Sequence, residues 1–374
     1  MDKKDLLEVR KLFSKSKSRV STIAGVYISP DHTVLSSFTR TAAAMDEDTA
    51  DMLTALAAKG MSGKLFRNQI PVEFPIEEEK DGGRQERLNR LLKSGLSDKQ
   101  EILDFCNHLE LPLEDNLLIL FTYGVYDVPK KAKDQTTLDD SDLVYSFLHI
   151  DFCPVEERKR CPVFDASSGT FVPSVSEPEA KPPICGLLYP AFSDRCPDIH
   201  SALYYSKSIK DRHPEIVEML TGADTLPLDE AQQKSVFKET VEEALGRECN
   251  FESVRDASLA IGDLAKENPE AAKETGPAEI KRILLDTSAG KRKQSEIDQA
   301  VSDSLQDGQT LNAELVSAGS KMVIASPDVT ISVRRETAGL LETGVVDGRE
   351  CILIPIADGL TLDGIHVLPS QTNA

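Results

Sequence analysis

The spacing of hydrophobic and polar positions divides the first sixty residues into a helix, a hairpin and a second helix. Leu6, Val9 and Phe13 recur at helical spacing and predict an amphipathic N-terminal helix. The stretches RVSTIAGVYIS and TVLSSF flank a turn-forming Pro-Asp pair, which predicts a β-hairpin. MDEDTADMLTALAAKG predicts a helix with acids in its first turn, and we expect Gly60 to end it.

Strand patterns become frequent in the next part of the chain. KLFRNQIPVEF predicts a strand that Pro71 restricts to a sheet edge, because proline has no backbone N–H. Two helices follow the acidic loop EEEKDGG, and Ser97 with Gln100 predicts a capping box at the start of the second. DNLLILFTYGVYDVP and LVYSFLHIDF predict buried strands, and VFDASSGTFV predicts a hairpin that turns at Ser168 and Gly169.

The second half of the chain changes from helices to strands. RHPEIVEML, with Pro214 in its first turn, begins a helical region that continues to about residue 306. No Phe or Tyr occurs from residue 252 onward, whereas 12 of the chain's 20 lie between 121 and 205. Because aromatic side chains bury the largest areas, the best-packed core is expected in that central block. The last segment returns to strands, with a hairpin predicted at Asp347-Gly348.

These elements predict an α+β fold, since the strands form hairpins and meanders and do not alternate regularly with helices. A length of 374 residues indicates two to three domains. We expect an α+β domain at 1–222 with its aromatic-rich core at 121–205, a helical section at 223–318 and a β-rich C-terminal unit at 319–374.

Composition is typical of a soluble globular protein, with 40% hydrophobic and 28% charged residues. The net charge of −20 repels phosphate backbones at long range. No apolar run approaches the roughly 20 residues of a membrane span, and no signal peptide is evident, so a cytoplasmic location is expected. Seven irregularly spaced cysteines fit reduced thiols, most of them buried, better than a disulfide framework.

The chemically richest stretch is LLYPAFSDRCPDIHSALYY at 187–205, which encloses a polar loop at 194–200. Asp198 or His200 fits the role of a base or ligand, and Arg195 fits bidentate binding of a carboxylate or phosphate. Asp and Ser beside a Cys-Pro pair are equally typical of a loop that bonds its own backbone, and we favour that structural interpretation. The candidate binding site comprises Asp127, Asp194, Arg195, Asp198, His200 and Tyr204.

Metal and nucleotide motifs are incomplete. Cysteines at 153, 161, 185 and 196 lie in one block, Cys196 with His200 forms a C-x3-H pair, and His149 and Asp151 share a strand face. Without a CxxC pair these spacings match no zinc knuckle, so we predict no metal and no cofactor. SAGKRK lacks the pattern of a phosphate-binding loop, and neither GxSxG nor GxGxxG occurs. Cys153 followed by proline is expected to be a buried, inert thiol.

Several blocks together resemble a known family: VSTIAGVYI, MSGKLFRNQIPVEFP, LLILFTYGVYDVP, the Cys-Pro-Val after it, LLYPAFSDRCPDIHSALYYSKS and DGRECILIPI. The chain resembles an uncharacterised bacterial family that is typical of Gram-positive anaerobes and classified as a domain of unknown function. The resemblance covers most of the chain and implies a bacterial cytosolic protein. It supplies no activity and no functional residue. The layout of an α/β front and a strand-rich tail is also similar, at the level of fold, to a nucleoid-associated family.

Three functions remain open. The first is a non-enzymatic binding or regulatory protein, whose partner is another protein or a small anionic ligand, and we lean toward it. The second is a hydrolase-like enzyme that acts on an anionic substrate at the polar loop, with Asp127 nearby. The third is nucleic-acid association through the first twenty residues, which hold seven Lys or Arg against three acids.

Overall fold

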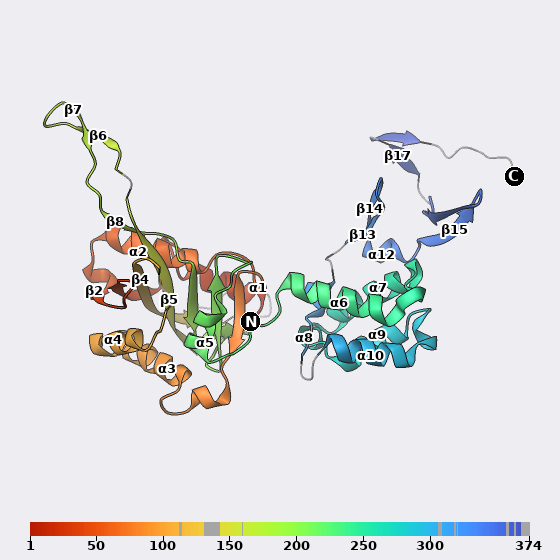
Figure 1. Ribbon diagram of the computed structural model, residues 1–374, viewed down its shortest axis with the longest axis horizontal. Helices are drawn as coiled ribbons and strands as arrows, with labels where there is room; N and C mark the ends of the chain where they lie inside the picture. Colours follow the sequence, from red (N-terminus) through yellow and green to blue (C-terminus); the bar gives the residue numbers. More distant parts are fainter. Residues whose placement is uncertain are drawn as a thin grey trace. The chain divides into compact units, whose positions relative to one another are not determined.

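A computed structural model describes residues 1–111, 114–130, 143–158, 160–305, 309–317, 319, 321–356, 359–362 and 364–367. The chain forms two compact units, Met1–Pro227 and Leu228–Ala374 (Figure 1). The elements confirm the predicted α+β class. The finer predicted division at residues 222 and 318 stays a prediction.

An eight-stranded antiparallel sheet forms the centre of the first unit, in the order β2-β1-β4-β5-β9-β12-β3, with β8 paired to β5. The strands are β1 (Val20–Ile28), β2 (Val34–Thr41), β3 (Gln69–Glu73), β4 (Leu117–Val128), β5 (Leu143–Glu157), β8 (Pro178–Ala180), β9 (Cys185–Tyr189) and β12 (Ser201–Ser206). The predicted hairpin near the N-terminus is confirmed as β1–β2. Pro71 lies in β3 at the edge of the sheet, also as predicted.

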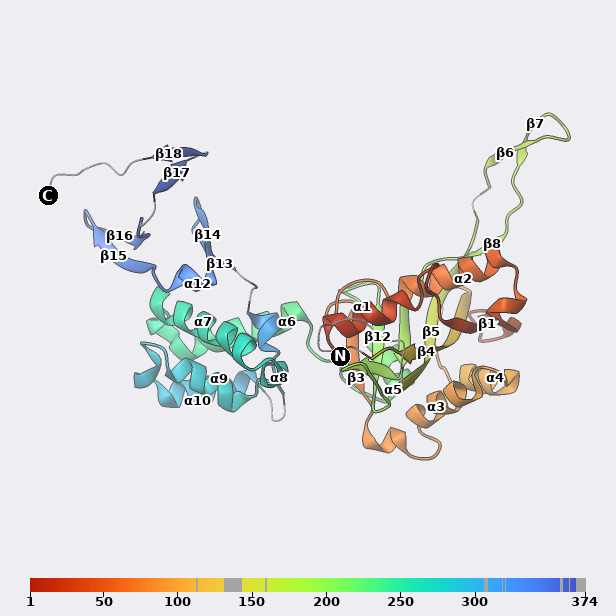
Figure 2. The same cartoon turned by 180° about the vertical axis from the view of Figure 1, so that it is seen from behind.

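Helices cover both faces of this sheet (Figures 1 and 2). One face carries α1 (Lys3–Lys11), η1 (Ala42–Ala44) and α2 (Glu47–Gly60). The other carries η2 (Ile76–Glu79), α3 (Arg84–Ser94), α4 (Lys99–Asn107) and α5 (Pro214–Thr221). The first helix buries Leu6 and Val9 with Phe13 just beyond it, which confirms the predicted amphipathic pattern. Two separate hydrophobic cores result, one on each face.

Aromatic side chains from the predicted central block fill these cores. The ring of Tyr145 lies 4.7 Å from that of Phe192 and 5.8 Å from that of Phe147. Phe147 in turn lies 5.3 Å from Phe13, so β5 is packed directly against the start of the chain. On the opposite face of the sheet, Phe121 packs edge-on against Phe105 of α4.

Two short hairpins extend the first unit. One pairs β6 (Pro162–Asp165) with β7 (Thr170–Pro173), and the other pairs β10 (Ala191–Ser193) with β11 (Cys196–Asp198). The β6–β7 hairpin confirms the turn predicted at Ser168 and Gly169, where Gly169 takes a φ of 63°. It projects beyond the body of the unit (Figures 1 and 2).

The second unit consists of a helical cluster followed by hairpins. The helices are α6 (Glu230–Leu245), η3 (Gly246–Glu248), α7 (Phe251–Glu267), α8 (Pro269–Lys273), α9 (Pro277–Leu285), η4 (Gly290–Arg292), α10 (Gln294–Ser304), α11 (Ala313–Val316) and α12 (Arg335–Ala338). The hairpins pair β13 (Lys321–Ala325) with β14 (Thr330–Arg334), β15 (Glu342–Val346) with β16 (Arg349–Leu353) and β17 (Leu360–Leu362) with β18 (Ile365–Val367). Asp347 and Gly348 form the predicted turn, at φ values of 51° and 73°. No helix in the described part of the chain is both long and apolar enough to cross a membrane.

Two local predictions need correction. The cap of α4 is Asp98, whose carboxylate accepts the N–H of Gln100 at 2.8 Å, and the predicted cap Ser97 still belongs to the preceding turn, where its N–H donates to Ser94. All seven cysteines are free thiols, but only Cys106, Cys153 and Cys185 are buried. The prediction that Gly60 ends its helix is confirmed, since Gly60 is the last residue of α2.

Gly60 is required because α2 touches the sheet at this residue. A Cβ atom at position 60 would lie 1.9 Å from Asp151 Oδ1 and 2.8 Å from His149 Cε1, both on β5. The absence of a side chain therefore sets how closely α2 approaches the sheet.

We expect Gly60→Ala to destabilise the first unit. Alanine improves helix propensity by about 1 kcal/mol, but overpacking typically costs about 1–3 kcal/mol, so the clash with Asp151 should dominate. Urea unfolding measures the difference. The control is the same change in an Asp151→Ala background, where the loss should be smaller. Equal losses in both backgrounds would contradict the explanation.

Candidate functional site

Arg195 links the β10–β11 turn to the first helix. Asp194 and Arg195 occupy the turn at φ values of 50° and 60°, and their backbone N–H groups donate to the Asp5 carboxylate at 3.1 and 3.3 Å. The Arg195 guanidinium donates to both Glu8 oxygens at 3.0 and 2.9 Å and to the Pro129 carbonyl at 2.8 Å. The hydrogen bonds of Arg195 therefore fasten α1 to the sheet.

The other end of the polar loop has different partners. The Asp198 carboxylate accepts the N–H of His200 at 3.1 Å and also the hydroxyl of Ser201. His200 is exposed, and its Nδ1 lies 2.8 Å from Glu79 Oε1, a hydrogen bond that raises the pKa of the imidazole. The Asp198 interactions are the backbone-bonding pattern that we favoured for this loop.

The remaining two candidates lie apart from the loop. Tyr204 is buried in β12, where its hydroxyl donates to the Arg212 carbonyl at 2.8 Å and burial raises its pKa. Asp127 is exposed on β4. The six predicted site residues therefore lie in four separate surroundings: Asp194 with Arg195, Asp198 with His200, Tyr204 alone and Asp127 alone.

A buried ionisable pair lies on the sheet face under α2. His149 and Asp151 are 1% and 0% exposed, and His149 Nδ1 lies 3.1 Å from Asp151 Oδ2 without hydrogen-bond geometry. No described residue accepts from or donates to the two imidazole nitrogens or the two carboxyl oxygens. Burial raises the pKa of Asp151, and the nearby imidazole opposes that shift only in part.

These two residues do not extend into a metal site with the cysteines. Cys153 and Cys185 are buried, and burial raises the pKa of both thiols, whereas Cys161 and Cys196 are exposed. Within the described ranges, no three His, Cys, Asp or Glu side chains lie close enough to hold a metal ion.

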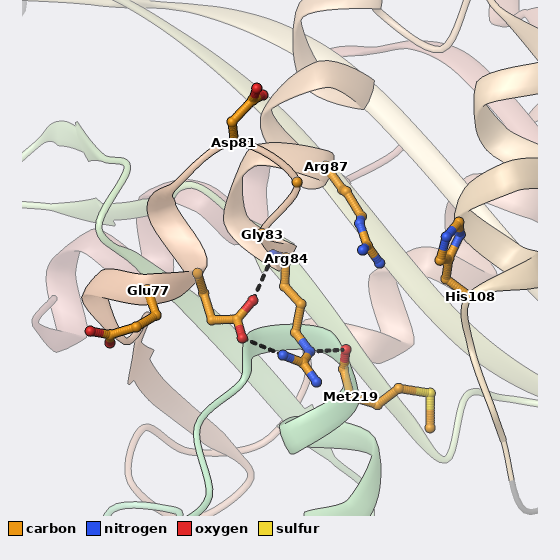
Figure 3. Close-up of a pocket in the computed structure, with 9 residues that line it drawn as sticks. Glu77, Asp81, Gly83, Arg84, Arg87, His108 and Met219 are labelled. Carbon is orange, nitrogen blue, oxygen red and sulfur yellow. Dashed lines mark hydrogen bonds and ion pairs between the residues drawn. The ribbon is translucent and has the colours of Figure 1, made fainter.

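A cavity of about 410 Å³ opens beside α3, between η2, the end of α4 and α5 (Figure 3). Its wall at the start of α3 is held by one ion pair. The Arg84 guanidinium bonds to Glu78 and donates to the Met219 carbonyl at 3.0 Å, and Glu78 also accepts the Arg84 N–H at 2.8 Å. Gly83 allows this geometry, since a Cβ there would lie 2.2 Å from the Glu78 carbonyl oxygen.

Two other side chains face the cavity with polar atoms that have no partner among the described residues. Arg87 lies one turn into α3, and no ion pair or side-chain hydrogen bond joins its guanidinium to any residue that the structure describes. His108 ends α4, and its Nδ1 lies 2.6 Å from the Asp104 carbonyl, which leaves Nε2 for another partner. Figure 3 shows Arg87 and His108 directed toward the same space, while Glu77 and Asp81 point away from it.

Sequence reasoning missed this cavity, because its residues come from segments without a shared motif. Residues 77–83 were interpreted as an acidic loop, and His108 and Met219 lie far from them in sequence. The only local signal was Gly82-Gly83 directly before a helix with arginines in its first turn, a pattern that places backbone N–H groups at an exposed helix start.

Comparison with known protein families identifies the family to which the chain belongs. A family model described as a domain of unknown function (DUF4317) matches residues 1–365, so the chain belongs to this family. The predicted resemblance is confirmed to that extent, and the bacterial range that it implied stays a prediction. No curated protein matches the chain.

We expect Asp151→Asn to stabilise the protein increasingly as pH rises. The folded pKa of Asp151 lies above the unfolded value of about 3.9, so its contribution to stability is complete below pH ~4 and is lost as pH rises through the folded pKa. Asparagine has no charge to bury, so the gain at pH 7 should be on the order of 1 kcal/mol or more. Urea unfolding between pH 4 and 8 measures it. Asp127→Asn, on the exposed part of β4, is the control and should show no such trend. A stability gain for Asp151→Asn that does not change with pH would refute the prediction.

Proposed function

We propose that this chain is a non-enzymatic binding or regulatory protein of the bacterial cytoplasm that takes up a small anionic ligand beside α3. The observation that carries the proposal is Arg87. Its guanidinium faces a cavity of about 410 Å³ and has no ion-pair partner among the described residues. Cavities of roughly 300–1,000 Å³ are the usual size of small-molecule sites.

The chemistry of the cavity favours an anion that is planar or tetrahedral. Arginine presents a rigid fork of donors that fits a carboxylate or a phosphate bidentately. Glu78 does not compete for Arg87, since it is already bonded to Arg84. The start of α3 adds the positive end of the helix dipole, and His108 in its imidazolium form can donate from Nε2 to an anion, because Nδ1 already donates to the Asp104 carbonyl.

A binding role is supported over catalysis by what lines the cavity. Its described lining includes no serine, threonine, cysteine or lysine, and of its carboxylates Glu78 is bonded to Arg84 while Glu77 and Asp81 point away from the cavity (Figure 3). The alternative enzyme at the polar loop has less support, because Arg195, Asp198 and His200 are engaged with separate partners.

Nucleic-acid binding through the N-terminal helix also has less support than the anion cavity. Arg10 donates to the Met61 and Gly63 carbonyls, and Lys15 pairs with Asp51 at 2.5 Å. Two of the seven basic residues in this region are therefore already engaged within the fold.

We expect inorganic phosphate or a short dicarboxylate such as succinate to raise the unfolding temperature of the full chain. A ligand at about 100 times its Kd stabilises the folded state by about 2.7 kcal/mol. Differential scanning fluorimetry with each anion, at constant ionic strength, measures the shift. Arg87→Gln should abolish it, because the bidentate donor is lost.

Arg90→Gln is the matched control. Arg90 lies on the same helix and pairs with Glu86 at 2.9 Å, so its loss removes the same charge without altering the cavity lining. This variant should keep the full anion-dependent shift. Equal shifts in both variants, or no shift with either anion in the unsubstituted protein, would overturn the proposed function.

A further inference from the structure

The β6–β7 hairpin carries an exposed aromatic pair away from the body of the first unit (Figures 1 and 2). Phe164 and Phe171 are cross-strand partners, with ring centroids 5.6 Å apart, and they are 61% and 67% exposed. The hairpin begins at Pro162, a few residues beyond Glu157, where β5 leaves β8. We call residues 158–177 the arm.

The tip of the arm is ordered and charged. The Asp165 carboxylate accepts the backbone N–H groups of Ser167 at 3.0 Å and Ser168 at 3.2 Å, and it accepts the Ser167 hydroxyl. Hydrogen bonds from these two serines lower its pKa to about 2. A permanent charge at the tip opposes insertion into lipid, so the aromatic pair behind it is suited to a protein surface.

The same unit offers a surface of matching character at the β1–β2 turn. A cavity of about 260 Å³ lies there, with Ile28, Cys106 and Leu109 buried at its floor and Val34 at its side. Exposed polar residues surround this apolar floor, which is the arrangement of a pocket that receives an aromatic anchor. The adjacent strand β2 is a sheet edge, and its Leu35 is 51% exposed.

The arm and the cavity lie at the same end of the sheet. Ile28 pairs with Leu117, the first residue of β4, and Leu117 pairs with Pro154 in the last part of β5, which leads into the arm. In a two-fold dimer both copies contribute the same surface. The arm of each copy can then dock on the cavity of the other at the same time.

The basic residues near the root of the arm are opposite in charge to the residues beside the cavity, whereas Asp165 makes the tip of the arm negative. Arg158 and Arg160 are exposed on the arm. Glu110 borders the cavity, and Glu114 and Asp115 follow it as exposed residues before β4. This arrangement aligns an incoming arm and disfavours contact between two cavities.

We propose that the arm of one copy docks on the β1–β2 cavity and the β2 edge of a second copy, and that the exchange is reciprocal. Phe164 or Phe171 fills the cavity as the aromatic anchor, and the exposed edge of β2 lies along the hairpin. The occupant is this chain itself, because the chain supplies both an unburied aromatic hairpin with basic residues near its root and an apolar cavity with acidic residues beside it.

Analytical ultracentrifugation of the full chain across a concentration series tests the exchange. The unsubstituted protein should dimerise, and Phe164→Ser with Phe171→Ser should raise the dimer Kd by about tenfold or more, since central aromatic anchors dominate interface energies. Val175→Ser, which removes another exposed apolar side chain of the arm outside the aromatic pair, should leave the Kd nearly unchanged. A monomer at every concentration, or equal dimerisation by all three proteins, would overturn the proposal.

Cross-linking identifies the surfaces directly. In a background where the exposed Cys161, Cys196 and Cys249 are replaced by serine, one sample carries Val34→Cys and a second carries Phe171→Cys. Mixed under mild oxidation, the two should form a disulfide-linked dimer several-fold faster than either sample alone. A mixture that cross-links no faster than the separate samples would place the contact elsewhere and overturn the exchange.

Discussion

The burial of the Asp151 carboxyl group in the middle of β5 constrains much of the first unit. This group is 0% exposed, and two neighbouring elements, α2 and β9, each place a glycine beside it. A Cβ at Gly60 of α2 or at Gly186 of β9 would lie 1.9 or 2.9 Å from Asp151 Oδ1. Gln69 also holds the end of α2 in place, because its side-chain amide donates to the Gly60 and Ser62 carbonyls at 2.9 Å each.

Because of this constraint, α2 closes the sheet face that carries His149 and Asp151. Both proposed binding sites lie elsewhere in the first unit. Around His149 and Asp151 the helix contacts the strands too closely to admit a ligand. The cavity beside α3 lies with the helices of the opposite face, and the β1–β2 cavity lies at the end of the sheet, where strands give way to turns. The two proposed binding surfaces therefore lie where the packing around the buried pair does not reach.

Local sequence patterns predicted the elements well, because helix and strand periodicity report burial along a single segment. The hairpin at Asp347-Gly348 and the edge position of Pro71 follow from backbone chemistry that one or two residues determine. The partners of the polar loop could not be predicted in this way. Arg195 is held by Glu8 and Asp194 by Asp5, and no spacing rule connects the first helix to a turn so far along the chain.

The role of Gly60 shows most clearly what a single sequence leaves out. The sequence predicts that the helix ends at this glycine, and α2 does end there. The physical reason is nevertheless tertiary, because the missing side chain makes room for a carboxyl group on a strand that follows about ninety residues later. Asp151 itself looked like a metal ligand by its residue type, yet its burial and its closely packed neighbours make it a determinant of packing. A residue type indicates what chemistry is possible, and only the surrounding atoms decide whether that chemistry is accessible.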